Sequence, residues 1–129
     1  MSGPAGDGPV RAALAGDPVL AEHYAAFRAK AEGALNPALV VMIRETIARV
    51  HGMPAATIDH AVLDEGTRAC LAYAARIPFE HTTITDPEAA ELVAHLGEPR
   101  FVAFSVVAAL ADAECRAALV DLPGLVGAD

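Results

Sequence analysis

Charged and proton-carrying side chains gather between Arg44 and His60. An imidazole, whose ordinary pKa lies near ~6.5, can give or take a proton beside a developing enolate, and His60 supplies one. Glu45 and Asp59 are carboxylates that could orient that ring. Arg44, together with Arg116 late in the chain, could hold an anionic substrate through charge-assisted hydrogen bonds. These residue types indicate acid–base chemistry on a small organic acid.

Each of these residues also has an ordinary structural interpretation. Glu45 and Arg49 are spaced i,i+4 on an expected helix, and this spacing favours a surface ion pair, worth roughly a few tenths of a kcal/mol, over a catalytic role. On a helix that starts at Pro54, His60 would lie on the polar face, where solvated histidines are common. Asp59 would lie near the apolar face and would need an arginine partner, unless the helix is rotated. For His60 both interpretations stay open.

The composition describes one acidic, alanine-rich domain. A chain of 129 residues suits a single core, and its 54% hydrophobic residues are dominated by alanine, which favours helices. The net charge of −8 argues against nucleic-acid and anionic-membrane partners. The N-terminal stretch lacks the basic and apolar regions of a signal peptide. We therefore expect a cytoplasmic protein whose two thiols, Cys70 and Cys115, are reduced and structurally buried.

Proline and glycine mark the ends of the expected helices. Asp17–Pro18 and Asn36–Pro37 each look like an N-cap followed by proline at the first helical position, and Gly52 suits a helix end. The segment from Thr67 either continues the helix before it or begins a new one. We expect about six helices, with a loop at 78–85: 17–33, 36–52, 54–66, 67–77, 86–97 and 98–120.

The pattern as a whole predicts an all-α, single-domain helical bundle. We expect a disordered lead-in at 1–10, one helical domain at 11–122 and a tail at 123–129. In the helix at 36–52, one stripe of apolar residues should face the core: Leu39, Ile43, Ile47 and Val50.

The final helix is apolar on nearly every side along 101–111. This run of eleven residues is about half of the ~20 that cross a bilayer, so no membrane span is expected. Such a helix should instead be enclosed on every side by protein. Because a chain of this size can hardly enclose it alone, the pattern favours a homo-oligomer.

The order of these segments resembles the alkylhydroperoxidase D and carboxymuconolactone decarboxylase superfamily. The resemblance covers about three-quarters of the chain, in "LNPALVVMIRETIARVHGMPAATIDH", "RACLAYAARI", "TITDPEAAELVAHLG" and "FVAFSVVAALADAECR". It implies an alkylhydroperoxidase D-like helical bundle with a pocket between helices at His60, assembled as trimers or as hexamers built from them.

Five positions carry the family's motif or its loss. Gly52 matches the family's glycine before the first cysteine, His60 its histidine, and Arg116 the arginine late in the closing helix. Met53 and Ala56 stand where the family has its Cys-x-x-Cys pair. Thiol peroxidase chemistry by the family's route needs a thiolate and a resolving thiol, so we do not expect it here.

The decarboxylase branch, as the resemblance implies, works without the cysteine pair but keeps a glutamate and the histidine. The family's glutamate falls on Val41 here, and Glu45 lies one turn further along the same side of the helix. The resemblance therefore favours His60 as the proton carrier, Glu45 or Asp59 as its orienting group, and Met53 as part of the substrate site.

The functional hypothesis is a thiol-independent decarboxylase, isomerase or cyclase acting on a small organic acid, lactone or polyketide-like substrate. The alternative is a non-catalytic protein that binds a small ligand or serves as an oligomeric interaction module. A residual redox role for Cys70 or Cys115 is the third interpretation.

We expect no metal and no cofactor, because no histidine pair has ligand spacing and no nucleotide fingerprint is present. His51 is interpreted as a cation that stabilises a helix C-terminus.

Overall fold

The structure, a computed structural model, describes residues 8–127 of the chain. In that range it contains seven α-helices, two short 3-10 helices and no strand, which confirms the all-α prediction. The α-helices are α1 (Pro9–Ala13), α2 (Pro18–Gly33), α3 (Pro37–Val50), α4 (Glu65–Glu80), α5 (Asp86–Leu96), α6 (Glu98–Leu119) and α7 (Leu122–Gly127). The 3-10 helices are η1 (His60–Val62) and η2 (His81–Thr83).

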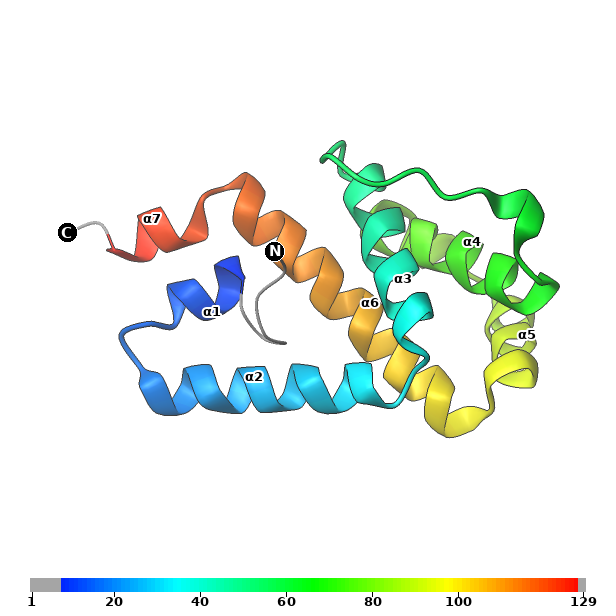
Figure 1. Cartoon of the computed structure of the whole chain (residues 1–129), viewed down its shortest axis with the longest axis horizontal. Coiled ribbons are helices and arrows are strands. Elements are labelled where there is room, and N and C mark those ends of the chain that lie inside the picture. Colours follow the sequence, from blue (N-terminus) through cyan, green and yellow to red (C-terminus); the bar gives the residue numbers. More distant parts are fainter. Residues whose placement is uncertain (1–7, 128–129) are drawn as a thin grey trace.

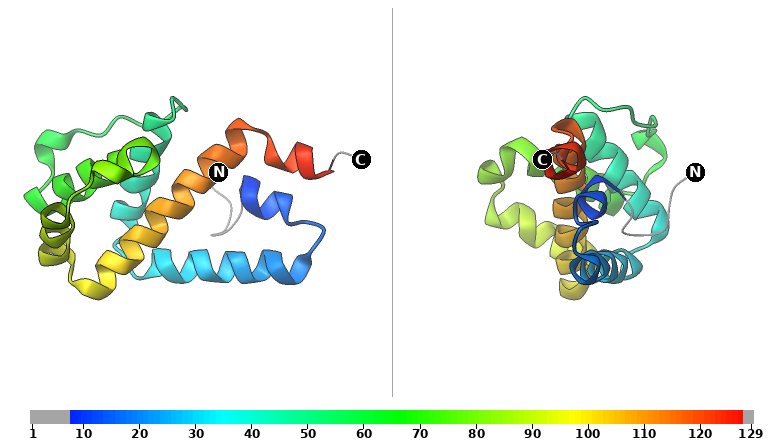
Figure 2. Two further views of the ribbon diagram at one scale, coloured as in Figure 1. Left: turned by 180° about the vertical axis from the view of Figure 1, so that it is seen from behind. Right: turned by 90° about the vertical axis from the view of Figure 1, so that its left-hand side faces the viewer.

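The long helix α6 is the centre of the molecule. It runs diagonally through the bundle, with α1, α2 and α7 towards one end and α3, α4 and α5 towards the other (Figures 1 and 2). It contacts all six of the other α-helices. Its buried residues are Ala103, Phe104, Val107, Ala108, Ala111 and Ala117. Val102 is 57% exposed, so this chain alone does not enclose α6 on every side, and its enclosure by a partner subunit stays a prediction.

The core joins α3 to α6. Ile43 and Ile47 of α3 are fully buried and belong to one cluster with Phe104 of α6. The predicted apolar stripe is thus confirmed at these two isoleucines, whereas Val50 is 36% exposed because α3 ends there, at the edge of the core. Val40, which the stripe omitted, is buried.

The predicted caps of the first helices are confirmed. The Asp17 side chain accepts a hydrogen bond from the backbone nitrogen of Leu20 at 3.1 Å, and that of Asn36 accepts one from Ala38 at 2.8 Å. Gly52 has a φ of 75°, a left-handed conformation that glycine adopts without strain, and the chain turns away from α3 at this residue.

The helix predicted at 54–66 is wrong. Residues 53–59 have no regular secondary structure and lead into η1, and α4 begins at Glu65 with Asp64 as its N-cap instead of Thr67. A helix of this length is marginal without tertiary support. Here the peptide groups are used differently, because the nitrogen and oxygen of Ala56 are both bound by side chains of α3.

Smaller corrections concern other helix ends. The predicted loop at 78–85 loses its first residues, because α4 runs through Pro78 to Glu80. Thr85 caps α5 through a capping box with Glu88, which places Asp86 inside the helix. The lead-in predicted at 1–10 is wrong at its end, where α1 begins, and residues 1–7 lie outside the described residues. The tail predicted at 123–129 is helical up to residue 127.

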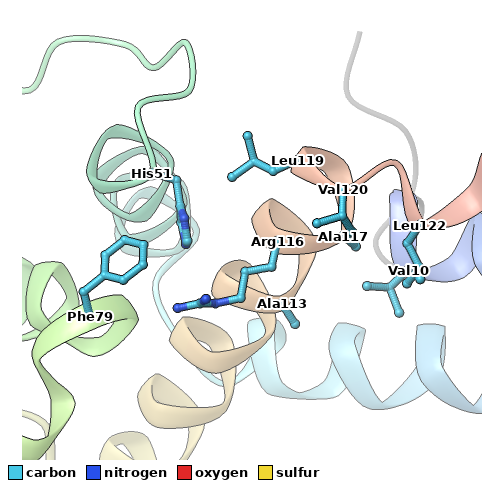
Figure 3. Close-up of a pocket in the computed structure, with 9 residues that line it drawn as sticks. All are labelled: Val10, His51, Phe79, Ala113, Arg116, Ala117, Leu119, Val120 and Leu122. Carbon is cyan, nitrogen blue, oxygen red and sulfur yellow. The ribbon is translucent and has the colours of Figure 1, made fainter.

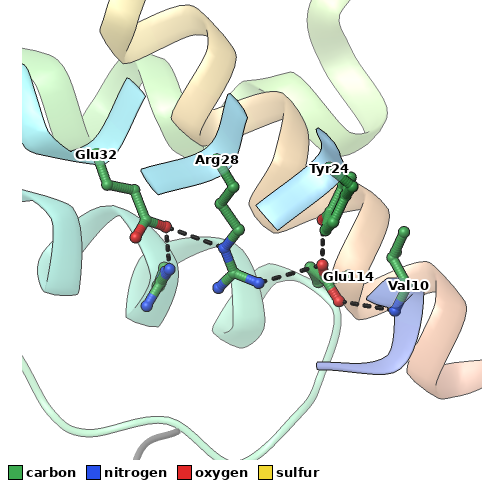
Figure 4. Close-up of polar contacts among 6 residues, drawn as sticks. Val10, Tyr24, Arg28, Glu32 and Glu114 are labelled. Carbon is green, nitrogen blue, oxygen red and sulfur yellow. Dashed lines mark hydrogen bonds and ion pairs between the residues drawn. The ribbon is translucent and has the colours of Figure 1, made fainter. Parts of the chain in front are cut away.

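A largely buried polar network connects α1 and α2 to the core (Figure 4). The Glu114 carboxylate of α6 accepts hydrogen bonds from the Tyr24 hydroxyl, from Arg28 Nη1 at 3.2 Å and from the Val10 nitrogen at 3.0 Å. Arg28 also bonds Glu32 at 3.1 Å. Burial, and then the bond to Glu114, raise the pKa of the Tyr24 phenol above its usual value. The network therefore fixes α1, and with it Val10, against α6.

The two faces of α3 give a test of this packing. Ile43→Ala should lower the free energy of unfolding by about 2–5 kcal/mol, because a fully buried side chain would leave a cavity. Val41→Ala on the same helix should change it by less than about 0.5 kcal/mol, since Val41 is 55% exposed. Urea denaturation followed by circular dichroism measures both. Equal losses would contradict the orientation of α3.

Candidate functional site

A histidine and an aspartate meet where the end of α3 reaches α6. His51, the C-cap residue of α3, places its Nε2 atom 2.6 Å from Oδ1 of Asp112. The His51 side chain is only 3% exposed and that of Asp112 is 19% exposed. A carboxylate bound to one imidazole nitrogen fixes the tautomer and orientation of the ring. His51 therefore does more than the helix-end role interpreted from the sequence.

Arg116 and Phe79 complete this group. Asp112 also accepts hydrogen bonds from Arg116 Nε, at 3.1 Å to each oxygen, one helical turn along α6. Arg116 Nη2 donates to the carbonyl oxygen of Pro78 at 2.6 Å, and its guanidinium lies 5.0 Å from the centre of the Phe79 ring. The Phe79 and His51 rings pack edge to face, with their centres 5.0 Å apart. Three elements, α3, α4 and α6, thus hold one cluster of four side chains.

The cluster borders the largest of the described pockets, which has a volume of about 670 Å³ (Figure 3). His51, Phe79 and Arg116 lie on one side of the pocket, and the other side is formed by apolar residues of α1, α6 and α7. The apolar lining residues are Val10, Phe79, Ala113, Ala117, Leu119, Val120 and Leu122. The pocket is an open apolar groove, since Leu119 and Val120 of its lining are more than half exposed, and a few polar groups converge on one side of it, as in many small-molecule sites.

The local sequence explains how the polar groups reach the pocket. Gly52 ends α3 directly after His51, so the imidazole stands at the helix end. Asp112 and Arg116 are spaced i,i+4, which places them on one face of α6. Pro78 lies in the last turn of α4, and its carbonyl oxygen anchors the arginine. The site is therefore built on helix ends and faces that the core already holds in place.

This arrangement suits proton transfer. With Nε2 donating its hydrogen to Asp112, Nδ1 is the unprotonated nitrogen of a neutral His51 ring and can act as a base. Among residues 8–127 Nδ1 has no hydrogen-bond partner, so its lone pair is not engaged by another group of the protein. Arg116 has N–H groups beyond those bound to Asp112 and Pro78, and these are available to an anion.

The residues expected at the site from the sequence are distributed differently. Arg116 is part of the cluster just described. His60 is exposed at the start of η1, on the border of a separate, smaller pocket. Asp59 is also exposed and caps η1 by accepting a hydrogen bond from Ala61 at 3.0 Å. The expectation that Asp59 is near-buried and paired with an arginine is therefore wrong, because the helix assumed for this segment does not form.

Glu45, Met53 and Arg44 have structural contacts. The Glu45 carboxylate accepts a hydrogen bond from the Ala56 nitrogen at 2.5 Å, while Arg49 binds the Ala56 oxygen at 2.6 Å. Glu45 and Arg49 thus both bind the backbone of Ala56 instead of forming the expected surface pair with each other. Met53 is half-buried, and its nitrogen bonds the Ala48 oxygen as the chain leaves α3. Arg44 pairs with Glu32 in the polar network.

The cysteines are in environments that oppose thiolate chemistry. Burial, and secondarily the charge of Asp64, raise the pKa of the Cys70 thiol to about 11. Cys70 borders a pocket of about 350 Å³ with His95, yet its side chain is almost fully buried. Burial also raises the pKa of the half-buried Cys115 thiol. The thiol form of both residues is favoured at neutral pH.

Sequence reasoning missed His51 and Asp112 as a pair. The i,i+4 spacing of Asp112 and Arg116 was a visible signal of a shared helix face, and Gly52 marked the helix end. Asp112 lies 61 residues from His51 in sequence, and this separation hid the contact, since only the packing of α3 on α6 creates it. Phe79 falls in the loop expected at 78–85, where no local pattern connects it with His51 or Asp112.

No family model, no curated protein and no solved structure matches the chain. Across residues 8–127, no group of three His, Cys, Asp or Glu side chains is arranged to hold a metal ion. None of the helices described is both long enough and apolar enough to span a bilayer.

The raised thiol pKa gives a pH-dependent test. In a Cys115→Ser variant only Cys70 can react, and its labelling by a thiol reagent should keep accelerating about tenfold per pH unit up to about pH 10, because the thiolate fraction grows until the pH reaches the pKa. An ordinary thiol would level off near ~8.5. Stopped-flow labelling, with circular dichroism to monitor folding, measures this. A plateau below pH 9 would contradict the buried environment of Cys70.

Proposed function

We propose that the protein is a thiol-independent enzyme that moves protons on a small organic acid, lactone or related carbonyl compound. The observation that carries this proposal is the His51–Asp112 hydrogen bond at the wall of the large apolar pocket, beside the Arg116 guanidinium. A general base, a group that orients it and a cation for an anionic substrate are the parts that such a reaction requires.

The roles of the side chains follow from their positions. Arg116 binds the substrate's carboxylate or carbonyl oxygen with its remaining N–H groups, while the apolar walls bind the carbon skeleton. His51 Nδ1 removes a proton from the carbon next to the carbonyl group, and the electron pair of the C–H bond moves to the carbonyl oxygen to form an enolate. Asp112 stabilises the imidazolium formed in this step.

The proton is then returned. Delivery to a different carbon isomerises the substrate. In a decarboxylation the bond to the carboxylate breaks instead, the carboxylate leaves as carbon dioxide, and the electron pair of the broken bond forms the enolate. His51, protonated beforehand from solvent, supplies the proton to carbon. Neither route needs a thiol, a metal ion or a redox partner, which is consistent with the raised thiol pKa values.

Membership of the alkylhydroperoxidase D and carboxymuconolactone decarboxylase superfamily is part of the proposal. The all-helical architecture, the end of α3 at Gly52 and the long apolar α6 support it. The chain differs from the family's expected arrangement in its proton carrier, because His60 is exposed and His51 is the histidine paired with a carboxylate. Assembly into trimers or hexamers stays a prediction.

A non-catalytic protein that binds a ligand or another copy of itself is the second candidate. It is favoured by the exposure of the apolar side chains beside the pocket, since Phe79 is 62%, Leu119 56% and Val120 58% exposed. Apolar side chains grouped at a pocket rim are typical of surfaces that another molecule covers. Under this hypothesis the pocket binds small acids without exchanging their protons.

Solvent deuterium exchange distinguishes the two. A panel of small carboxylic acids, lactones and polyketide-like acids is incubated with the protein in D₂O, and proton NMR follows loss of the signals next to each carbonyl group. We expect exchange or turnover of at least one compound. His51→Gln should slow it by about 10²–10⁴-fold, the usual contribution of a general base. Asp112→Asn should also slow it, while Cys70→Ser should have no effect.

His23→Gln is the matched control, because His23 is an exposed histidine of α2 that lines none of the described pockets. Equal loss of exchange in His23→Gln and His51→Gln would contradict the assignment of His51. Binding of panel compounds in the large pocket without any exchange would replace the enzymatic proposal with the non-catalytic one. Circular dichroism of each variant establishes that the loss is not one of folding.

A further inference from the structure

A second pocket, of about 250 Å³, lies between α3, α4 and the segment 53–64. It is separate from the large pocket and shares none of its lining residues. Arg49 of α3, Arg68 of α4 and His60 of η1 provide its ionisable groups. Thr46 of α3 adds a hydroxyl group. Its floor is apolar and includes Ile58 and the fully buried Leu71. No carboxylate belongs to the lining of this pocket among the residues that the structure describes.

The two arginines differ from most of the others in the chain. Arg49 bonds the carbonyl oxygen of Ala56 at 2.6 Å, and Arg68 bonds that of Leu63 at 2.7 Å. A carbonyl oxygen holds a guanidinium without cancelling its charge. By contrast, five arginines are paired with carboxylates: Arg11, Arg28, Arg44, Arg76 and Arg116. In a chain with a net charge of −8, the second pocket is therefore a local concentration of positive charge.

The nearby acidic residues are engaged elsewhere. Asp64 is the acid that Arg68 influences electrostatically, but its carboxylate caps α4 by accepting a hydrogen bond from Thr67 at 2.7 Å. Asp59 caps η1, and Glu45 binds the Ala56 nitrogen. None of these carboxylates forms an ion pair with the two arginines among residues 8–127.

We infer that this pocket is a binding site for a small organic carboxylate with an apolar body. Two guanidinium groups and an imidazole can hold the carboxylate by charge-assisted hydrogen bonds, and the apolar floor accommodates a short aliphatic chain or a single ring. An uncharged compound would form no ion pair with the two arginines. An inorganic anion would make no apolar contact with the floor of the pocket.

The arginines are also held in position before a ligand arrives. Each guanidinium is tied to the segment between α3 and α4, Arg49 by one carbonyl oxygen and Arg68 by two, and each keeps further N–H groups. Ordering flexible side chains opposes binding, so arginines that are already tied lose less freedom when the carboxylate binds. The same bonds fold this segment over the ends of α3 and α4, which explains why it has a fixed path without being helical.

The experiment is a titration of the ¹⁵N-labelled protein with benzoate, using benzamide as the uncharged probe of equal shape and inorganic phosphate as the anion without an apolar body. Amide shifts of Leu71, Ala72 and Ala75 report on this pocket, and those of Ala113 and Ala117 report on the large one. We expect saturable benzoate binding that moves the first group, weakens as salt is added, and exceeds the affinity for benzamide and phosphate at least tenfold.

Matched variants test the arginines. Arg68→Gln and Arg49→Gln should each weaken benzoate binding at least tenfold. Arg100→Gln removes the same charge from an exposed position at the start of α6, outside this pocket, and should leave binding unchanged. Arg49→Lys, which keeps the charge, serves if a glutamine variant fails to fold, and it should retain more affinity than Arg49→Ala.

Four results would overturn the inference. They are benzamide or phosphate binding as tightly as benzoate, equal weakening by Arg100→Gln and Arg68→Gln, shifts confined to the residues of the large pocket, and no saturable binding at tens of millimolar benzoate. The inference does not rest on the proposed enzymatic function, since His51 and Asp112 are not part of this pocket.

Discussion

The packing of α3 against α6 is the constraint on which the rest of the structure depends. Ile43 and Ile47 are completely buried in the cluster that contains Phe104, and burial of such side chains is the main source of stability in a domain of this size. Once these two helices are in register, the end of α3 brings His51 to within hydrogen-bond distance of Asp112. The candidate site is therefore a consequence of core packing.

Charged side chains then set the positions of the remaining walls. The Glu114 carboxylate accepts hydrogen bonds from residues of α1 and α2. Arg28 forms ion pairs with both Glu114 and Glu32. Ion pairs as buried as these cost desolvation energy that their attraction only partly offsets, so we assign them a positioning role more than a stabilising one. By holding α1 they place Val10 at the pocket.

The sequence allowed the helical class and most helix ends to be predicted, because these depend on neighbouring residues. The caps at Asp17 and Asn36 and the turn at Gly52 are local effects of that kind. The helix expected at 54–66 failed because the chain's tertiary contacts, made by side chains of α3, outweighed a weak local preference. The candidate site was only partly predictable for the same reason, since its histidine and aspartate are joined through the fold.

The central claim is that Asp112 holds the His51 ring with Nε2 protonated and Nδ1 free to act as a base. Long-range ¹H–¹⁵N NMR of the histidine side chains in alkaline solution measures this directly, because the two nitrogens have different resonances in each tautomer. The account predicts an Nε2–H ring for His51, and a mixture of tautomers in Asp112→Asn. An Nδ1–H ring in the unaltered protein, or one whose tautomer is unchanged by Asp112→Asn, would contradict it.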